Sequence, residues 1–296
     1  MTKKHFLISA PGRTEISGNH TDHQRGCVLA AAVNLETVAD VMLNGSNNIR
    51  VRSEGFPEVV VELDDLNIRE EEKNTSAALV RGVAAAFEQL GARIKGFDAE
   101  THSTVLPGSG LSSSAAFEVL MGTICNELFF DRKLSPVEIA QIGQYAENVY
   151  FGKPSGLMDQ AASSVGGMVY IDFADPDHPQ VERIEFDFEK AGHALCIIGF
   201  LGLVTKSGYS SWMYLQNISP AGATQHQEVA VALAMCDTLL NGRGAYRVHG
   251  GGFAGTVQAF VPVDMLEEFK SGIERVLGEG SCHVLHIRNE GGVRLS

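Results

Sequence analysis

Short apolar runs along the chain are separated by longer stretches in which apolar residues recur at helical spacing. The short runs predict strands, at 6–10, 28–33, 48–53, 59–63, 168–173, 194–198, 245–250, 256–261 and 283–287. The longer patterns predict helices, at 75–90, 135–150, 221–240 and 263–277. Because strands and helices are mixed without regular alternation, the pattern favours an α+β fold over a doubly wound sheet.

Local sequence signals indicate where one helix begins and where one loop lies. Ser135-Pro136-Val137-Glu138 combines a capping box with proline at the first helical position, so a helix should begin there. The polar segment 175–179 indicates a loop, and 296 residues are enough for two domains. We therefore expect a boundary near residue 180, which gives domains 1–180 and 181–296.

Composition limits the classes of binding partner and the cellular compartment that we expect for the protein. A formal net charge of −13 argues against a nucleic-acid partner, because proteins that neutralise a phosphate backbone usually carry positive charge. Five scattered cysteines, never spaced Cys-x-x-Cys, favour free thiols in the cytoplasm over disulfides or a zinc site. The longest apolar run, 194–204, is shorter than the roughly 20 residues of a membrane span, so we expect no membrane association.

The stretch Gly12–Gly26, GRTEISGNHTDHQRG, gathers histidines, carboxylates, arginines and an asparagine around several glycines. It is too polar for a core strand and too rich in functional groups for an ordinary turn. Considered alone, it is compatible with a metal site as well as with a pocket for a polar ligand.

A second motif, VLPGSGLSSSAAFEVL at 105–120, reads as a strand end, a Gly- and Ser-rich turn and a helix start. Glycines let the backbone approach a ligand, and the first turn of a helix presents N–H groups to an anion. It predicts a phosphate-binding loop, although it lacks the GK[ST] of a Walker A sequence. A capped helix after a tight turn explains the motif equally well.

Two further stretches carry candidate chemistry. HGGGFAGTVQAF, at 249–260, places three glycines and an aromatic residue before a strand, which also fits a sharp turn with close packing. AENVYFGKPSGLMDQAASSVGG, at 146–167, holds Glu147 and Asp159 among small residues. Taken singly, Asp159 could be a carboxylate at a helix terminus, and Glu147 a solvated helix residue.

Together and in this order, the four motifs resemble those of the GHMP kinase superfamily, and within it the galactokinases. GRTEISGNHTDHQRGCVLAAAV is similar to the galactokinase signature, LPGSGLSSSAA to the phosphate loop and GGGFAG to the third glycine motif. The resemblance implies a fold of two α+β domains with the active site in the cleft between them. It also implies ATP-dependent phosphorylation of a sugar, galactose above all, at its anomeric hydroxyl.

The resemblance assigns roles to individual residues. Asp159 would be the catalytic base, and Arg13 the cation beside it that keeps it ionised. Ser114 and Glu147 would hold Mg²⁺. The sugar-binding positions would be Asn19, His20, Asp22 and Gly156. The nucleotide-binding positions would be Pro107, Gly108, Ser109, Gly110, Leu111, Ser112, Ser113, Ser114, Gly251 and Gly252. The implied ligands are a small sugar and ATP; the sequence does not fix the oligomeric state, and we expect a monomer.

The chain departs from the galactokinase pattern in three respects. Asn19 stands where the signature has Glu, which leaves the identity of the sugar open. Glu15 and His23 replace the signature's Asn and Tyr. Near 199–202 the chain passes over a long helical segment of the galactokinases, and we expect the given sequence to omit it rather than the protein to lack it.

These departures keep three functions in view. The first is a galactose 1-kinase, and the second is a related kinase for another sugar or an amino sugar. The third is a catalytically inactive regulator that binds sugar and ATP, against which the presence of Asp159, Arg13 and the uninterrupted SSSAA loop argues.

Overall fold

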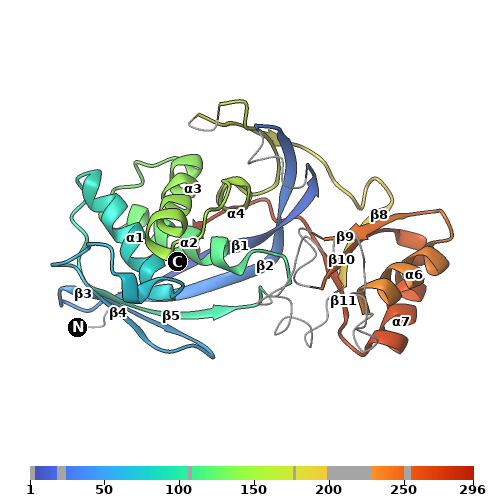
Figure 1. Ribbon diagram of the computed structural model, residues 1–296, viewed down its shortest axis with the longest axis horizontal. Coiled ribbons are helices and arrows are strands. Elements are labelled where there is room, and N and C mark those ends of the chain that lie inside the picture. The colour runs from blue at the N-terminus through green and yellow to red at the C-terminus, as the bar shows by residue number, and fades with distance from the viewer. Residues whose placement is uncertain (1–3, 19–24, 106–108, 176–177, 199–227, 250–254) are drawn as a thin grey trace. The chain divides into compact units, whose positions relative to one another are not determined.

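The computed structural model describes residues 4–18, 25–105, 109–175, 178–198, 228–249 and 255–296 (Figure 1). The described residues form two compact units. The first draws on Met1–Val105, Ser113–Ile184 and Arg288–Ser296, and the second on Leu106–Ser112 and Glu185–Ile287. Each unit combines a sheet with helices, so the predicted α+β class is confirmed.

An eight-stranded sheet forms the frame of the first unit. Its main path runs β12-β1-β2-β5-β3-β4, while β6 pairs with β2 and with β7. All these pairs are antiparallel except β3 with β5. The strands are β1 (His5–Ser17), β2 (Cys27–Leu43), β3 (Asn48–Ser53), β4 (Val59–Glu62), β5 (Phe97–Ser103), β6 (Met168–Asp172), β7 (Gln180–Ile184) and β12 (Val293–Arg294).

Four α-helices pack against one face of this sheet (Figure 1). They are α1 (Ser76–Gln89), α2 (Ser113–Phe129), α3 (Pro136–Tyr145) and α4 (Met158–Val165). Ile8, Val41 and Phe97 of the sheet are buried in one cluster with Phe87 of α1 and Leu120 of α2. A short 3₁₀ turn, Glu70–Glu72, precedes α1.

The predicted capping box at the start of α3 is confirmed. Ser135 Oγ accepts a hydrogen bond from Glu138 N, and Glu138 Oε2 accepts one from Ser135 N at 2.8 Å. The helix was expected to reach about Tyr150, but its α-helical part ends at Tyr145 and continues as a π-helical turn, η3 (Ala146–Phe151). Gly152, at φ 86°, ends that turn.

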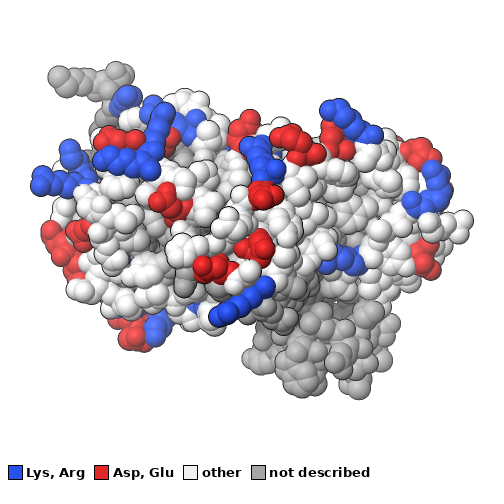
Figure 2. Space-filling view, turned by 90° about the horizontal axis from the view of Figure 1, so that it is seen from above, with Lys and Arg blue, Asp and Glu red and all other residues white. Residues whose placement is uncertain are grey.

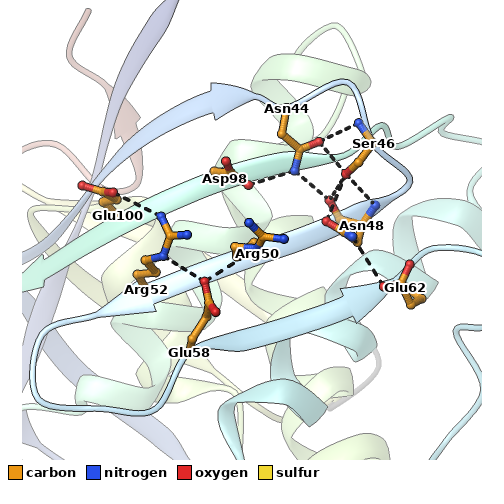
Figure 3. Close-up of polar contacts among 9 residues, drawn as sticks. All are labelled: Asn44, Ser46, Asn48, Arg50, Arg52, Glu58, Glu62, Asp98 and Glu100. Carbon is orange, nitrogen blue, oxygen red and sulfur yellow. Dashed lines mark hydrogen bonds and ion pairs between the residues drawn. The ribbon is translucent and has the colours of Figure 1, made fainter.

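The other face of the sheet carries a polar network (Figure 3). Strand β3 alternates, so that Ile49 and Val51 enter the core while Arg50 and Arg52 point outward. Arg52 Nε donates to Glu58 at 2.8 Å, and Arg52 also lies 3.5 Å from Glu100 on β5. These exposed pairs contribute little stability each, but they mark a solvated face.

The second unit has a four-stranded antiparallel sheet in the order β11-β8-β10-β9. Its elements are β8 (His193–Ile198), α6 (Glu228–Leu240), β9 (Ala245–Val248), β10 (Val257–Pro262), η5 (Val263–Met265), α7 (Leu266–Leu277) and β11 (Cys282–Leu285). Residues of α6 and α7, among them Cys236 and Phe269, form one core with Cys196 and Ala259 of the sheet.

The polar stretch at 12–26 was judged too polar for a core strand, and this is wrong for its first part. Strand β1 continues through Gly12 to Ser17, with Arg13, Thr14 and Glu15 buried. Register partners on β2 are all alanines there, Ala32, Ala31 and Ala30. Small partners leave room for polar side chains inside the unit, which the local pattern of one strand does not reveal.

Candidate active site

Arg13 and Asp159 are 146 positions apart in the sequence and form a two-point contact inside the first unit. Arg13 Nε donates to Asp159 Oδ1 at 2.7 Å, and Nη2 lies 2.6 Å from Oδ2. The Arg13 side chain is 11% exposed and that of Asp159 is 29% exposed, so the carboxylate remains accessible from solvent. Such a bidentate pair fixes both the position and the orientation of the carboxylate.

The local structure of β1 and α4 explains how these two residues meet. The register of β1 against β2 shifts between Pro11 and Arg13, an irregularity of the kind that re-aims a side chain. Ser163 Oγ donates to the carbonyl of Pro11 at 2.6 Å and fastens α4 to β1 at this point. Asp159 lies one helical turn before Ser163, on the same side of α4.

Glu147 lies on the π-helical turn η3, and its carboxylate is held at both oxygens. Lys153 Nζ lies 2.7 Å from Oε1, and Gln160 Nε2 donates to Oε2 at 2.9 Å. Gln160 directly follows Asp159 on α4, so one helix positions both carboxylates. Single π-helical turns occur often at functional sites because they displace the residues of one turn from the α-helical path.

Glu118 is a member of this cluster that sequence reasoning missed. It lies on α2 with no exposed surface, and its Oε2 accepts a second hydrogen bond from Gln160 Nε2 at 2.8 Å. Burial and, next, the charge of Glu147 raise the pKa of Glu118 well above its ordinary value. A signal was present, because the stretch AAFEVL places one carboxylate in an otherwise apolar helix.

Lys153 supplies positive charge next to these carboxylates. Burial lowers its pKa, but the hydrogen bond and the charge of Glu147, followed by the charge of Asp159, outweigh burial and raise the pKa. The ammonium group is therefore charged at neutral pH.

Gly156 lies in a loop that hydrogen bonds fasten to the preceding helices. The neighbouring carbonyl of Ser155 accepts from Gln144 Nε2 at 3.0 Å and from Asn148 Nδ2 at 3.2 Å. Asn148 Oδ1 also accepts from Ser155 N at 2.7 Å. The loop between Glu147 and Asp159 is thus held in place, and Gly156 with it, half-buried.

The described part of the glycine loop belongs to the second unit. Gly110 has φ 73°, and a Cβ there would lie 2.8 Å from His249 Nδ1 and 3.3 Å from Thr256 Oγ1. His249 and Thr256 flank the third glycine motif, and His249 N donates to Thr256 O at 2.9 Å. Gly110 therefore packs directly on two residues that flank the third glycine motif, and only glycine fits at position 110.

Other loop residues are arranged for a tight turn into α2. Ser109 and Leu111 are buried, and Ser109 Oγ accepts a hydrogen bond from Leu111 N at 3.4 Å. Ser112 has φ 58°, and α2 begins at the next residue, so Ser113 and Ser114 occupy its first turn. The first N–H groups of a helix have no partner within the helix and are suited to an anion.

Several predicted site residues lie outside the described residues: Asn19, His20, Asp22, Pro107, Gly108, Gly251 and Gly252. The predicted omission near 199–202 also falls outside them.

On the face shown in Figure 2, Lys and Arg side chains are interspersed with Asp and Glu. No described helix combines the length and the apolar character that crossing a bilayer requires.

Two family models match the chain. Residues 78–167 match the GHMP kinases N-terminal domain, and residues 1–42 match the galactokinase galactose-binding signature. The first match contains α2, Glu147 and Asp159, and the second contains Arg13.

Curated relatives are galactokinases. That of Lacticaseibacillus casei is 36% identical over 159 residues, which are 53% of this chain and 41% of the relative. That of Clostridium beijerinckii is 38% identical over 162 residues, 54% of this chain and 41% of the relative. That of Streptomyces coelicolor is 34% identical over 190 residues, which are 64% of this chain and 49% of the relative. The chain thus matches less than half the length of these relatives.

Solved structures share the fold. A Lactococcus lactis galactokinase complexed with galactose aligns with a TM-score of 0.75 at 21% identity, covering 99% of this chain and 96% of that one. A Methanococcus jannaschii mevalonate kinase aligns with a TM-score of 0.74 at 13% identity, covering 98% and 100%. At these identities the likeness concerns the fold alone. The chain thus contains a stretch similar to the GHMP kinases N-terminal domain and one similar to the galactokinase galactose-binding signature, within a fold that these structures share.

Proposed function

We propose that the protein is an ATP-dependent sugar kinase that phosphorylates the anomeric hydroxyl of galactose. The observation that carries the proposal is the bidentate contact of Arg13 with a solvent-accessible Asp159. The choice of galactose is supported by the galactose-binding signature at residues 1–42 and by the galactokinase relatives.

Asp159 acts as the general base in this proposal. Its carboxylate accepts the proton of the sugar hydroxyl as that oxygen attacks the γ-phosphoryl group of ATP. Arg13 holds both carboxylate oxygens, so the base is oriented before the sugar arrives. The guanidinium also places a positive charge close to the sugar oxygen that attacks the phosphoryl group, where it stabilises the negative charge that develops in the transition state.

The glycine loop and the first turn of α2 hold the phosphates. Backbone N–H groups of the loop and the hydroxyls of Ser112, Ser113 and Ser114 donate to phosphate oxygens. The loop glycines, with Gly251 and Gly252 of the third motif, let the backbone approach ATP and the sugar.

Magnesium fits the oxygen groups of this chain. Ser114 contributes a hydroxyl and Glu147 a carboxylate, and hard oxygen ligands suit this ion. Among the described residues, no group of three or more His, Cys, Asp or Glu side chains forms a metal cage. That agrees with an ion bound by one or two protein groups and by the substrate's phosphates. When bound, Mg²⁺ neutralises charge on the β- and γ-phosphates.

A related acceptor is the second candidate function. Asn19 stands at a position where the galactokinase signature has Glu, and Glu15, two residues beyond Arg13 on β1, is buried. A carboxylate and an amide at changed positions alter the pattern of hydroxyls that the pocket accepts. His20, Asp22 and Gly156 complete the proposed sugar-binding set. We expect a monomeric enzyme in the cytoplasm.

An assay of ADP release across a panel of sugars tests the function. The panel holds galactose, glucose, mannose, galactosamine and N-acetylgalactosamine, and ³¹P NMR identifies the phosphorylated carbon. We expect galactose to give the highest kcat/KM and a 1-phosphate product. A higher value for another sugar would establish the second candidate, and no sugar-dependent ADP release would refute both.

A further inference from the structure

The Glu147 carboxylate is a buried anion with a cation that reaches it from solvent. The Glu147 side chain is 4% exposed, whereas that of Lys153 is 56% exposed and ends 2.7 Å from Oε1. The backbone adds a second tie, because Lys153 N donates to the carbonyl of Glu147 at 3.1 Å. Gly152, in the left-handed region at φ 86°, makes the turn that brings Lys153 back to Glu147.

The other polar groups of the cluster contact one another. Arg13 binds both oxygens of Asp159, and the Gln160 amide bridges Glu147 Oε2 to Glu118. Lys153 is the cation that contacts Glu147 among the described residues. A buried carboxylate is costly without such a partner, and Lys153 supplies that partner before any metal binds.

A lysine is suited to a temporary role at this oxygen. Its ammonium group is a strongly hydrated point charge on a flexible stem, and it can withdraw into water without breaking a bidentate contact. Magnesium prefers carboxylate oxygen and imposes near-ideal octahedral geometry at short range. Gln160 already donates to Oε2, so Oε1, the oxygen that Lys153 contacts, is the one on which both cations converge.

We infer that Lys153 is the resident counter-ion of Glu147 and competes with Mg²⁺ for Oε1, so that it sets the magnesium concentration the enzyme requires. This inference rests on the proposed role of Glu147 as a magnesium ligand. Lys153 is a positioning residue in this scheme, since it acts through Glu147.

Lys153→Met tests the competition with two readouts. The first is the Mg²⁺ concentration that gives half-maximal ADP release with galactose. The second is the Tm in saturating ADP, measured in EDTA and across a MgCl₂ titration. We expect the half-saturating Mg²⁺ concentration to fall by up to about fivefold, the range for losing a partly exposed ion pair. We also expect a lower Tm in EDTA and a larger gain in Tm on adding MgCl₂ than in the wild type.

Matched variants make the result specific. Lys73→Met removes a lysine whose Nζ also lies 2.7 Å from a carboxylate, that of Glu70, but there the carboxylate is 79% exposed. It should leave both readouts at wild-type values. Lys153→Arg keeps the positive charge and should keep the high magnesium requirement. If Lys153→Met does not fold, this variant still tests the competition, because a lower magnesium requirement in Lys153→Arg would contradict it.

Glu147→Gln separates the inference from the function on which it rests. If this variant loses Mg²⁺-dependent stabilisation while Lys153→Met behaves like the wild type, competition is refuted and the metal site stands. If Glu147→Gln keeps normal magnesium dependence, Glu147 is not a ligand and the inference falls with that assignment. If no variant or wild type releases ADP, the kinase proposal fails, and the Tm titration still decides the competition at Glu147.

Discussion

Glu118 shows how one residue's surroundings reverse its ordinary behaviour. Its carboxyl has no exposed surface and shares the Gln160 amide with Glu147, so burial and a neighbouring negative charge both favour its neutral form. The charged groups around it are Glu147, Asp159 and Lys153. Of the two carboxyl groups, Glu147 is the one that Lys153 contacts, at 2.7 Å.

Glu118→Gln should therefore flatten the pH dependence of stability. In the unfolded chain the carboxyl loses its proton near the ordinary value of 4.5, whereas the folded protein retains it to a higher pH. Stability contributed by this proton is complete below 4.5 and is lost as pH rises toward the raised pKa, at about 1.4 kcal/mol per pH unit between the two values. Urea unfolding at pH 5 and pH 8 measures the change.

The matched control for this prediction is Glu127→Gln. Glu127 lies on the same helix and pairs with the exposed Arg132 at 2.8 Å. We expect its pH dependence to follow the wild type, while the free energy of unfolding of Glu118→Gln falls less between pH 5 and pH 8. If the free energy of unfolding fell equally in Glu118→Gln and in the wild type, Glu118 would not be protonated in the folded protein.

At the scale of elements, the π-helical turn η3 depends on a close approach to α1. A Cβ at Gly82 of α1 would lie 2.8 Å from Ala146 Cβ and 2.9 Å from Ala146 Cα. Tyr150 of the same turn donates its hydroxyl to the carbonyl of Leu66 at 2.9 Å. The first contact packs η3 against α1, and the second fastens it to the segment that precedes α1, so both determine where Glu147 lies.

Gly82→Ala should destabilise the protein although alanine is the better helix former. The change normally stabilises a helix interior by about 0.5–1 kcal/mol, but overpacking against a backbone atom costs about 1–3 kcal/mol. We expect a net loss in the free energy of unfolding, measured by urea denaturation. Gly272→Ala on α7 is the control, since its Cβ would meet only the flexible end of Leu239. A stabilised Gly82→Ala protein would show that the approach is not tight.

Much of the element pattern could be predicted, because it depends on local periodicity. The run at 48–53 is β3 to the residue, and the helix predicted from Thr75–Ser76 is α1. Strand β7 (Gln180–Ile184) and helix α4 were not predicted. The burial of β7 does not alternate, and α4 is only eight residues long, so neither has a clear period.

For the site, sequence and structure contribute different residues. The resemblance drew attention to Arg13, Asp159 and Glu147, and the structure brings the first two into contact. Glu118 had a sequence signal, as the one carboxylate in an apolar stretch of α2. Lys153 and Gln160 could not be predicted, because their importance lies in contacts that join α2, α4 and the turn η3. Such contacts depend on how helices pack and leave no spacing rule in the sequence.

At the scale of the whole molecule, the proposed reaction is a phosphoryl transfer in which one carboxylate accepts the proton of the sugar hydroxyl. The first unit supplies that carboxylate with its arginine, and the second unit contains the described part of the glycine loop against His249 and Thr256. The proposed role of Arg13, which orients the carboxylate, depends on Asp159 being the base.

The most direct test compares kcat for galactose-dependent ADP release in wild type, Asp159→Asn and Asp98→Asn. Asp98, on the solvated sheet face, binds Asn44 at 2.9 Å and controls for loss of a charged aspartate (Figure 3). We predict that Asp159→Asn lowers kcat by about 10²–10⁴-fold, the usual contribution of a general base, while its Tm stays close to that of Asp98→Asn. Wild-type kcat in Asp159→Asn would contradict the account.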